Sequence, residues 1–320
     1  MDMSKILITG GAGFIGSNMA EAFLKKGYAI NILDNFSTGN IKNIETIKNN
    51  VSFFEGDICD PSIVSSAMKG CDFVFHLAAL RSVPKSFGDP TGYEKINVIG
   101  TIVLLEEALK NKIKKFVLAS SSSVYGDNVS LPLKEEYYPD PISPYAISKL
   151  NAEVYCRMYF KNFGLPTVSL RYFNVFGPRQ SLENKYAVVI PKFIQSLNLN
   201  ESPPIYGDGK QSRDFTFVEN VIAAHESVLK SNKANGKVFN AACGNRTTVN
   251  ELVQKLNKLI KKDIKPKYLD PRPGDVLHTQ ASIEQIQKYT DFKPQTTFEQ
   301  GLQKTVNWFL KHQDYLIARS

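Results

Sequence analysis

The stretch TGGAGFIGS, residues 9–17, decides the fold of this 320-residue chain. It places Gly10, Gly13 and Gly16 at three-residue spacing between an apolar run at 5–9 and a segment of helical periodicity that follows. The first glycine permits a tight turn. The second lets a pyrophosphate approach the backbone at a helix N-terminus, and the third lets the helix pack closely against the sheet. The stretch therefore predicts a dinucleotide-binding strand–turn–helix unit.

Strand and helix signals alternate through the first half of the chain. Strands are expected at 5–11, 29–35, 51–57, 71–79, 114–122 and 166–175, and helices at 16–27, 61–70, 93–111 and 143–164. Such alternation implies a parallel sheet with helices on both faces. The expected fold class is α/β, a Rossmann-type doubly wound parallel sheet, with a smaller C-terminal α/β lobe over the strand ends where such folds bind ligands.

Acidic residues at two strand ends identify the dinucleotide. Asp34 ends the second strand, 18 residues after Gly16. A carboxylate there accepts hydrogen bonds from the adenosine ribose and repels a 2′-phosphate, so the sequence favours NAD over NADP. Asp57 ends the third strand, and HLAA at 76–79 ends the fourth; both are expected to line the cofactor. We expect residues 1–172, with roughly 214–245, to form the NAD-binding domain.

Composition excludes several classes of protein. The net charge is +8, but the densest lysine cluster, KNKIKKF at 110–116, has no interleaved aromatics to stack bases, so no nucleic-acid partner is expected. No apolar run reaches the roughly 18 residues of a membrane span, and the first residues do not resemble a signal peptide. Four cysteines without a C-x-x-C pair and four histidines without ligand spacing predict no metal. We expect a cytoplasmic protein.

Three polar residues predict proton-transfer chemistry. Ser121 lies in SSSSVYG (120–126) at a strand end, and SPYAISK (143–149) opens a helix on which Tyr145 and Lys149 share a face. The Lys149 cation is expected to lower the pKa of Tyr145 towards neutrality. Tyr145 would then take a proton from a sugar hydroxyl while the carbon gives hydride to NAD, and Ser121 would bind the same oxygen.

Segments spread over about residues 4–310 resemble the extended short-chain dehydrogenase/reductase superfamily. Within it the chain is most similar to UDP-hexose 4-epimerases, especially the branch acting on N-acetylated sugars. The segments are TGGAGFIGS (9–17), LDNFSTGN (33–40), HLAAL (76–80), SSSSVYG (120–126), SPYAISKL (143–150), LRYFNVFGPRQ (170–180), IYGDGKQSRDFTFV (205–218) and RPGDV (272–276).

The resemblance implies a set of site residues. The catalytic trio would be Ser121, Tyr145 and Lys149. NAD contacts would come from Gly10, Gly13, Phe14, Ile15, Gly16, Asp34, Asn35, Ser37, Thr38, Gly39, Asp57, Ile58, Leu77, Ala78, Ala79, Asn97, Tyr145, Lys149, Tyr172 and Val175. Contacts to a UDP-sugar substrate would come from Arg81, Ser82, Ser122, Ser123, Asn174, Val188, Val189, Lys192, Tyr206, Arg213, Arg272, Asp275 and Thr279. Residues 173–213 and 246–320 would form the UDP-sugar-binding lobe.

Particular roles follow from the same resemblance. Arg213 and Arg272 would bind the pyrophosphate, which suits the planar guanidinium fork. Asn174 would contact the sugar diphosphate, Asp275 the uridine ribose, and residues 188–192 the uracil. The helices at 94–111 and 145–163 would pair with a second copy in a homodimer, through apolar residues such as Val103, Leu104, Val154 and Tyr159.

Related activities differ at two positions. Sugar-nucleotide 4,6-dehydratases of this superfamily carry an Asp-Glu pair where this chain has Ser122 and Ser123, and UDP-glucuronate decarboxylases carry a glutamate at the position of Ser123. The favoured activity is therefore NAD-dependent 4-epimerisation of a UDP-hexose through a 4-keto intermediate. Alternatives are UDP-glucose 4-epimerisation without N-acetyl activity, UDP-glucuronate 4-epimerisation, and a non-catalytic NAD-binding module.

Two residues bear on the choice of sugar. A small residue four positions after Asp275 would open the pocket to an N-acetyl group, and Thr279 occupies that position. This favours the interconversion of UDP-N-acetylglucosamine and UDP-N-acetylgalactosamine, with UDP-glucose and UDP-galactose also accepted. Arg81 stands where N-acetylhexosamine enzymes often have a small residue and glucose-type enzymes a lysine, so it leaves the preferred substituent open.

Overall fold

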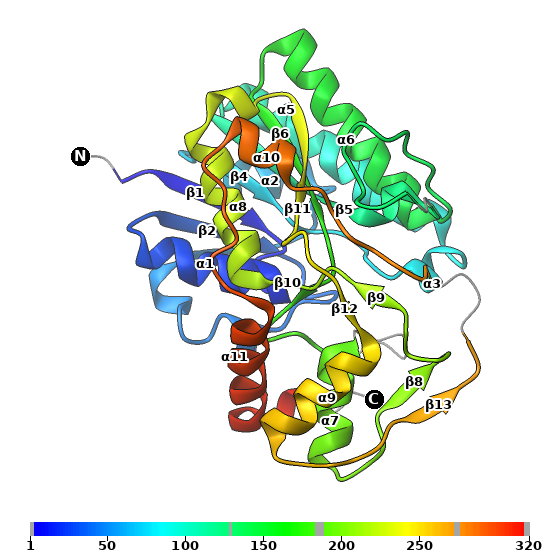
Figure 1. The fold of residues 1–320 in the computed structure, drawn as a ribbon. Helices are drawn as coiled ribbons and strands as arrows, with labels where there is room; N and C mark the ends of the chain where they lie inside the picture. The colour runs from blue at the N-terminus through cyan, green and yellow to red at the C-terminus, as the bar shows by residue number, and fades with distance from the viewer. Residues whose placement is uncertain (1–2, 128–129, 183–188, 272–275, 317–320) are drawn as a thin grey trace.

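A seven-stranded parallel sheet forms the centre of the molecule in a computed structural model. The structure describes residues 3–127, 130–182, 189–271 and 276–316. Its order is β11-β6-β5-β4-β1-β2-β3, which reverses direction between β1 and β4 (Figure 1). The strands are β1 (Lys5–Thr9), β2 (Ala29–Asp34), β3 (Ser52–Glu55), β4 (Phe73–His76), β5 (Lys115–Ser121), β6 (Thr167–Tyr172) and β11 (Lys237–Ala241). The doubly wound α/β fold predicted from the sequence is confirmed.

Helices cover both faces of this sheet, because alternate side chains of each strand point to opposite faces. On β1, Ile6 and Ile8 belong to a core that includes α1 (Phe14–Lys25) and α8 (Val218–Lys230). Leu7 belongs to a second core. The helices of that core are α2 (Pro61–Met68), α5 (Gly100–Lys110) and α6 (Pro144–Phe163).

The helix expected at 93–111 is built from three segments. These are α4 (Pro90–Glu94), a π-helical turn η3 (Lys95–Ile99), and α5. Within the π turn, the amide of the buried Asn97 exchanges hydrogen bonds with the backbone of Leu80, at 2.8 and 2.9 Å, and donates to the Ser148 hydroxyl at 2.9 Å. The turn therefore holds the end of the HLAAL segment against the start of α6.

Helix α6 begins where the Ser-Pro pair predicted. The Ser143 side chain accepts a hydrogen bond from the N–H of Ala146 at 3.2 Å, and Pro144 occupies the first turn. The helix ends at Gly164, whose φ of 70° is left-handed. Tyr145 is thus fixed in the first turn of the helix, beside the end of β5.

Smaller elements form the second part of the molecule and the connections. They are α3 (Val83–Ser86), α7 (Val189–Asn198), α9 (Val249–Ile260), α10 (Glu284–Tyr289), α11 (Phe298–Lys311), β7 (Val175–Phe176), β8 (Pro204–Tyr206), β9 (Ser212–Arg213), β10 (Thr216–Phe217), β12 (Thr247–Thr248) and β13 (Lys267–Leu269). The short strands pair as β7–β10, β8–β13 and β9–β12. Among the described helices, none is long and apolar enough to cross a membrane.

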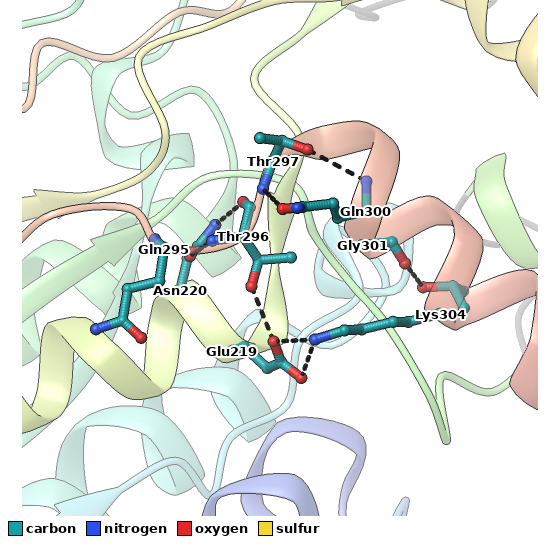
Figure 2. A network of polar contacts seen from close by, with 9 residues as sticks. Glu219, Asn220, Gln295, Thr296, Thr297, Gln300, Gly301 and Lys304 are labelled. Atoms are coloured by element: carbon teal, nitrogen blue, oxygen red, sulfur yellow. Dashed lines mark hydrogen bonds and ion pairs between the residues drawn. The ribbon is translucent and has the colours of Figure 1, made fainter.

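A polar network attaches α11 to α8 (Figure 2). The Asn220 amide donates to the carbonyl oxygen of Thr296 at 2.7 Å and accepts from the N–H groups of Gln295 and Thr296 at 2.9 and 3.0 Å. Glu219 accepts from the Thr296 hydroxyl at 2.8 Å and pairs with Lys304 at 2.6 Å. The C-terminal helix is therefore held on a helix of the central sheet, although the sequence placed it with the second lobe.

Candidate active site

A cavity of about 420 Å³ lies at the carboxyl ends of the central strands, where the strand order reverses. This is the usual ligand position in a doubly wound sheet. The cavity brings together most of the residues predicted for the cofactor: Gly10, Gly13, Phe14, Ile15, Gly16, Asp34, Asn35, Ser37, Thr38, Asp57, Ile58, Leu77, Ala78, Ala79, Tyr145, Lys149, Tyr172 and Val175. Ser121, Arg81 and Asn174 line it too.

The glycine-rich turn requires glycine at two of its positions. Gly10 has a φ of +69°, and a Cβ there would lie 2.8 Å from the backbone nitrogen of Ala78. A Cβ on Gly16 would lie 2.3 Å from the carbonyl oxygen of Gly10. Gly16 therefore allows α1 to lie against the turn itself. Gly13, Phe14, Ile15 and Gly16, at the start of α1, line the cavity, and a helix N-terminus is a suitable position for a pyrophosphate.

Asp34 holds the loops around the turn as well as lining the cavity. Its carboxylate accepts hydrogen bonds from the N–H groups of Ala12 and Phe36, each at 2.9 Å. Burial raises the pKa of this carboxyl, and the two backbone donors partly offset the rise. Each carboxylate oxygen has a second lone pair, so Asp34 has the capacity to accept from ribose hydroxyls as well.

Ser121 and Tyr145 meet at the opposite end of the cavity. The Ser121 oxygen accepts from the Ser123 hydroxyl at 2.9 Å and from the Ser123 N–H at 3.2 Å. Burial raises the pKa of Tyr145, while a hydrogen bond with Ser121 and the positive charge of Arg81 act to lower it. The net effect is a raised pKa of Tyr145, which is the opposite of the lowering expected from Lys149.

Lys149 makes a different contact from the one expected. Its ammonium donates to the carbonyl oxygen of Ala119 at 3.0 Å, and burial lowers the pKa of Lys149 to about 8. The i, i+4 spacing does place Tyr145 and Lys149 on the same cavity wall. The nearest acceptor for the ammonium, however, comes from β5, which spacing along one helix does not reveal.

The remaining predicted cofactor residues, Gly39 and Asn97, do not line the cavity. Gly39 lies against Asp34, since a Cβ there would be 2.8 Å from its carboxylate. Asn97 uses its amide on Leu80 and Ser148, and Ser148 donates to the carbonyl oxygen of Tyr145 at 2.8 Å. The described contacts of Asn97 therefore hold α6 close to Tyr145, through Ser148.

The predicted substrate residues fall into three groups. Arg81 and Asn174 line the cavity, and Asn174 donates to the Thr279 hydroxyl at 3.2 Å, which brings the second lobe to the cavity edge. Ser82, Ser122, Ser123, Val189, Lys192, Tyr206 and Arg213 do not line it. Val188, Arg272 and Asp275 lie outside the described residues.

Arg213 is held beside Thr279. Its guanidinium donates to the carbonyl oxygens of Ser212 and Leu277, each at 3.1 Å, and the Thr279 N–H donates to the Ser212 oxygen at 3.0 Å. This juxtaposition joins β9 to the segment that carries Thr279, the residue expected to admit or exclude an N-acetyl group.

Several cavity residues escaped the sequence analysis: Leu33, Asn40, Lys42, Asn43, Gly56, Leu80, Ile96, Ala119, Ser120, Arg179, Ser181, Asp314 and Tyr315. Those that flank motifs, such as Leu33, Gly56 and Ser120, could have been found by extending the motif. Asp314 and Tyr315 carry no such signal, because about 270 residues separate them from the loop they contact.

This chain is similar to known proteins over most of its length. Residues 7–305 match the family model described as GDP-mannose 4,6 dehydratase. A putative UDP-glucose 4-epimerase of Methanocaldococcus jannaschii is 37% identical over 305 residues, covering 95% of this chain and 97% of that protein.

Two solved structures are similar over nearly their whole length. One is a UDP-N-acetylglucosamine 4-epimerase from Methanobrevibacter ruminantium in complex with UDP-N-acetylmuramic acid. It has 41% identity and a TM-score of 0.92, with 98% of this chain and 100% of that one covered. The other is a UDP-glucuronic acid 4-epimerase from Bacillus cereus in complex with UDP-glucuronic acid and NAD. It has 32% identity and a TM-score of 0.88, with 96% and 99% covered.

Proposed function

Since the chain belongs to the extended short-chain dehydrogenase/reductase family of sugar-nucleotide epimerases and dehydratases, we propose that it is a UDP-hexose 4-epimerase with NAD as its bound cofactor. The observation that carries the proposal is one cavity. It joins the glycine turn and Asp34 at one end to Ser121, Tyr145 and Lys149 at the other.

The cavity fits NAD in its chemistry. The α1 N-terminus suits a pyrophosphate, Asp34 suits a ribose diol, and the end of β5 presents hydroxyl groups beside the expected nicotinamide. The chemistry that bound NAD supplies is reversible hydride transfer at C4 of the sugar, which passes through a 4-keto sugar. The structures similar to this chain include complexes with NAD, which supports the same cofactor here.

Tyr145 is the group that exchanges the proton of the sugar hydroxyl, and Ser121 orients the same oxygen. Because burial raises the pKa of Tyr145, its phenolate needs nearby positive charge. Arg81 acts in that direction, and Lys149 lies on the same wall one helical turn away. The acid and base roles thus fall to one phenol, which releases and recovers one proton in each cycle.

Dehydration is disfavoured by where the carboxylates lie. Among the described residues, those lining the cavity are Asp34, Asp57 and Asp314. Asp34 ends β2, three strands from β5 in the sheet, or roughly 14 Å at the usual strand spacing. Asp57 follows β3, one strand further away. Expelling water needs an acid and a base beside the reacting carbons, and Ser122 and Ser123 supply neither.

The proposed substrate pair is UDP-N-acetylglucosamine and UDP-N-acetylgalactosamine, with UDP-glucose and UDP-galactose accepted to a lesser degree. The support is the small side chain of Thr279, whose hydroxyl accepts a hydrogen bond from Asn174 on the cavity wall; a larger residue there would overpack the site. The similarity to a UDP-N-acetylglucosamine 4-epimerase supports this assignment. UDP-glucuronate is the second candidate, because the exposed cation Arg81 lines the cavity that holds Tyr145.

Separate incubations with UDP-N-acetylglucosamine, UDP-glucose and UDP-glucuronate test the proposal, with products resolved by chromatography. We expect the C4 epimer of the acetylated sugar to form fastest, with no net production of NADH. Thr279→Tyr should suppress the acetylated pair selectively, while Thr279→Ser, which stays small and keeps the hydroxyl, should not.

Other outcomes distinguish the alternatives. A 4-keto-6-deoxy product would show a dehydratase. Turnover of UDP-glucose with no turnover of UDP-N-acetylglucosamine would refute the proposed role of Thr279 in admitting the acetamide. It would remain consistent with 4-epimerisation. NAD binding with no turnover of any of the three sugars would favour the non-catalytic module.

A further inference from the structure

The last described turn of the chain, η6 (Gln313–Leu316), forms part of the wall of the cofactor cavity. Asp314 and Tyr315 line the cavity together with Lys42 and Asn43, which belong to the loop after β2. The cofactor end of the cavity is therefore closed by a segment far from the glycine motif in sequence.

Tyr315 fixes the orientation of a buried amide. Its hydroxyl donates to the side-chain oxygen of Asn43 at 2.8 Å, and Asn43 is 5% exposed. The amide nitrogen of Asn43 donates in turn to the carbonyl oxygen of Ala12, also at 2.8 Å. Both ends of the amide are thereby used. A flipped Asn43 would lose the bond to Ala12, because two oxygens would then face each other.

Ala12 is the residue through which this contact reaches the glycine-rich turn. It stands between Gly10 and Gly13, and its N–H donates to Asp34 at 2.9 Å. Tyr315, Asn43, Ala12 and Asp34 thus form one chain of hydrogen bonds. The chain runs from the C-terminal turn to the carboxylate expected to bind the adenosine ribose. Such a buried chain favours one arrangement of its members.

The turn η6 is itself held in place by packing. The Tyr315 ring stands edge-on to Trp308 of α11, with centroids 4.7 Å apart, and the Leu316 side chain is buried. Helix α11 is fixed to α8 by the network of Figure 2. Asp314 also pairs with Lys42 at 3.1 Å, but both side chains are at least half exposed, and such pairs contribute little. The buried bond to Asn43 is therefore the important one.

We propose that Tyr315 is a positioning residue for the cofactor, which holds the glycine-rich turn through Asn43 and so slows the release of NAD. This inference rests on the proposed function, because it assumes that NAD occupies the cavity. It assigns the C-terminal turn to the cofactor site, whereas the sequence placed residues 246–320 in the substrate lobe.

The test compares Tyr315→Phe with a matched control, Tyr268→Phe. Phenylalanine keeps the ring against Trp308 and removes only the hydroxyl. Tyr268, on β13, also donates its hydroxyl to an asparagine, Asn250 at 3.1 Å, and does not line the cavity. Equilibrium dialysis against labelled NAD gives the affinity, and release from loaded protein after dilution gives the dissociation rate.

We expect Tyr315→Phe to bind NAD about 3- to 10-fold more weakly, the usual effect of one hydrogen bond, mainly through faster release. Tyr268→Phe should bind and release NAD as the wild type does. Asn43→Ala should weaken NAD binding as well. The double variant should lose less free energy of NAD binding than the two single variants lose in total, because each substitution removes the same Tyr315–Asn43 hydrogen bond.

Several results would overturn the proposal. These are NAD release from Tyr315→Phe at the wild-type rate, full additivity with Asn43→Ala, or a cofactor-free Tyr315→Phe protein that unfolds well below Tyr268→Phe. The last would mean that the hydroxyl serves the fold rather than the cofactor. A wild-type protein that binds no NAD would instead refute the proposed function.

Discussion

The Lys149 ammonium donates to the main-chain oxygen of Ala119 at 3.0 Å, two residues before Ser121 on β5. This bond ties α6, which carries Tyr145, to the strand that carries Ser121. It also directs the lysine away from the simple phenol–ammonium pair that the Tyr-x-x-x-Lys spacing suggests. The groups that act to lower the pKa of Tyr145 are Ser121 and Arg81.

Replacing Tyr145 with phenylalanine removes the hydroxyl that we propose exchanges the proton of the sugar. We expect turnover to fall by about 10²–10⁴-fold, with the fold and NAD binding retained, because the ring still fills its site. The measurement is the rate of epimer formation alongside the stoichiometry of bound NAD. Tyr138→Phe, at an 86% exposed tyrosine, is the matched control. A Tyr145→Phe protein with a near-normal rate would refute the mechanism.

The pH–rate profile should show an alkaline limb set by Lys149. Burial lowers the pKa of this lysine to about 8, so it loses its positive charge as the pH rises through that value. We expect kcat/KM to decline above about pH 8. Lys149→Arg, which stays charged, should be slower but should lack this limb. An unchanged limb in Lys149→Arg would show that another group titrates there.

Two buried histidines should make the fold sensitive to acid. Burial lowers the pKa of His76 to about 3 and that of His225 to about 4, while both ring nitrogens of each contact protein groups. Below the ordinary value of 6.5, the unfolded chain binds protons that the folded chain does not, so the free energy of unfolding falls as the pH falls. For His225 the loss between pH 6.5 and 4 is roughly 3 kcal/mol.

Denaturant unfolding at pH 7 and pH 4.5 measures this effect. His225→Gln should lower stability at pH 7 and show a smaller further loss at pH 4.5, because the titrating group is gone. His312→Gln, at an exposed position, should keep the wild-type difference. Equal pH dependence in His225→Gln and the wild type would contradict the assignment.

We predict a homodimer formed through α5 and α6. Of the apolar residues expected at this interface, Leu104 and Tyr159 are instead buried in the core of the subunit. On α6, Val154 is 45% exposed and Ile147 is 42% exposed. Ile99, in the π-helical turn before α5, is 50% exposed. Those exposed side chains are the ones available to a second copy.

Light scattering at micromolar concentration should report twice the mass of the chain. Val154→Lys should shift the mass towards that of a monomer, because a lysine is costly to bury at an apolar contact. Tyr138→Lys, at an exposed position on no helix, is the control. A wild-type protein that stays monomeric would show the prediction to be wrong.

The sequence by itself was enough for the fold class and for residues at both ends of the cavity. The glycine turn, the first strand and the start of α6 depend on neighbouring residues. These are the left-handed φ of Gly10, the apolar run of Ile6, Leu7 and Ile8, and the Ser143 cap. Interactions within a few residues can be read from spacing, because local backbone geometry fixes where those side chains point.

Only the tertiary structure decided which partners those side chains meet. The bond of Lys149 to Ala119 spans 30 residues, and that of Tyr315 to Asn43 spans 272. Burial then set the pKa values of Tyr145 and Lys149 against the simple expectation from their spacing. Desolvation and long-range hydrogen bonds depend on how helices and strands pack against one another. The spacing of apolar residues along the sequence does not specify that packing.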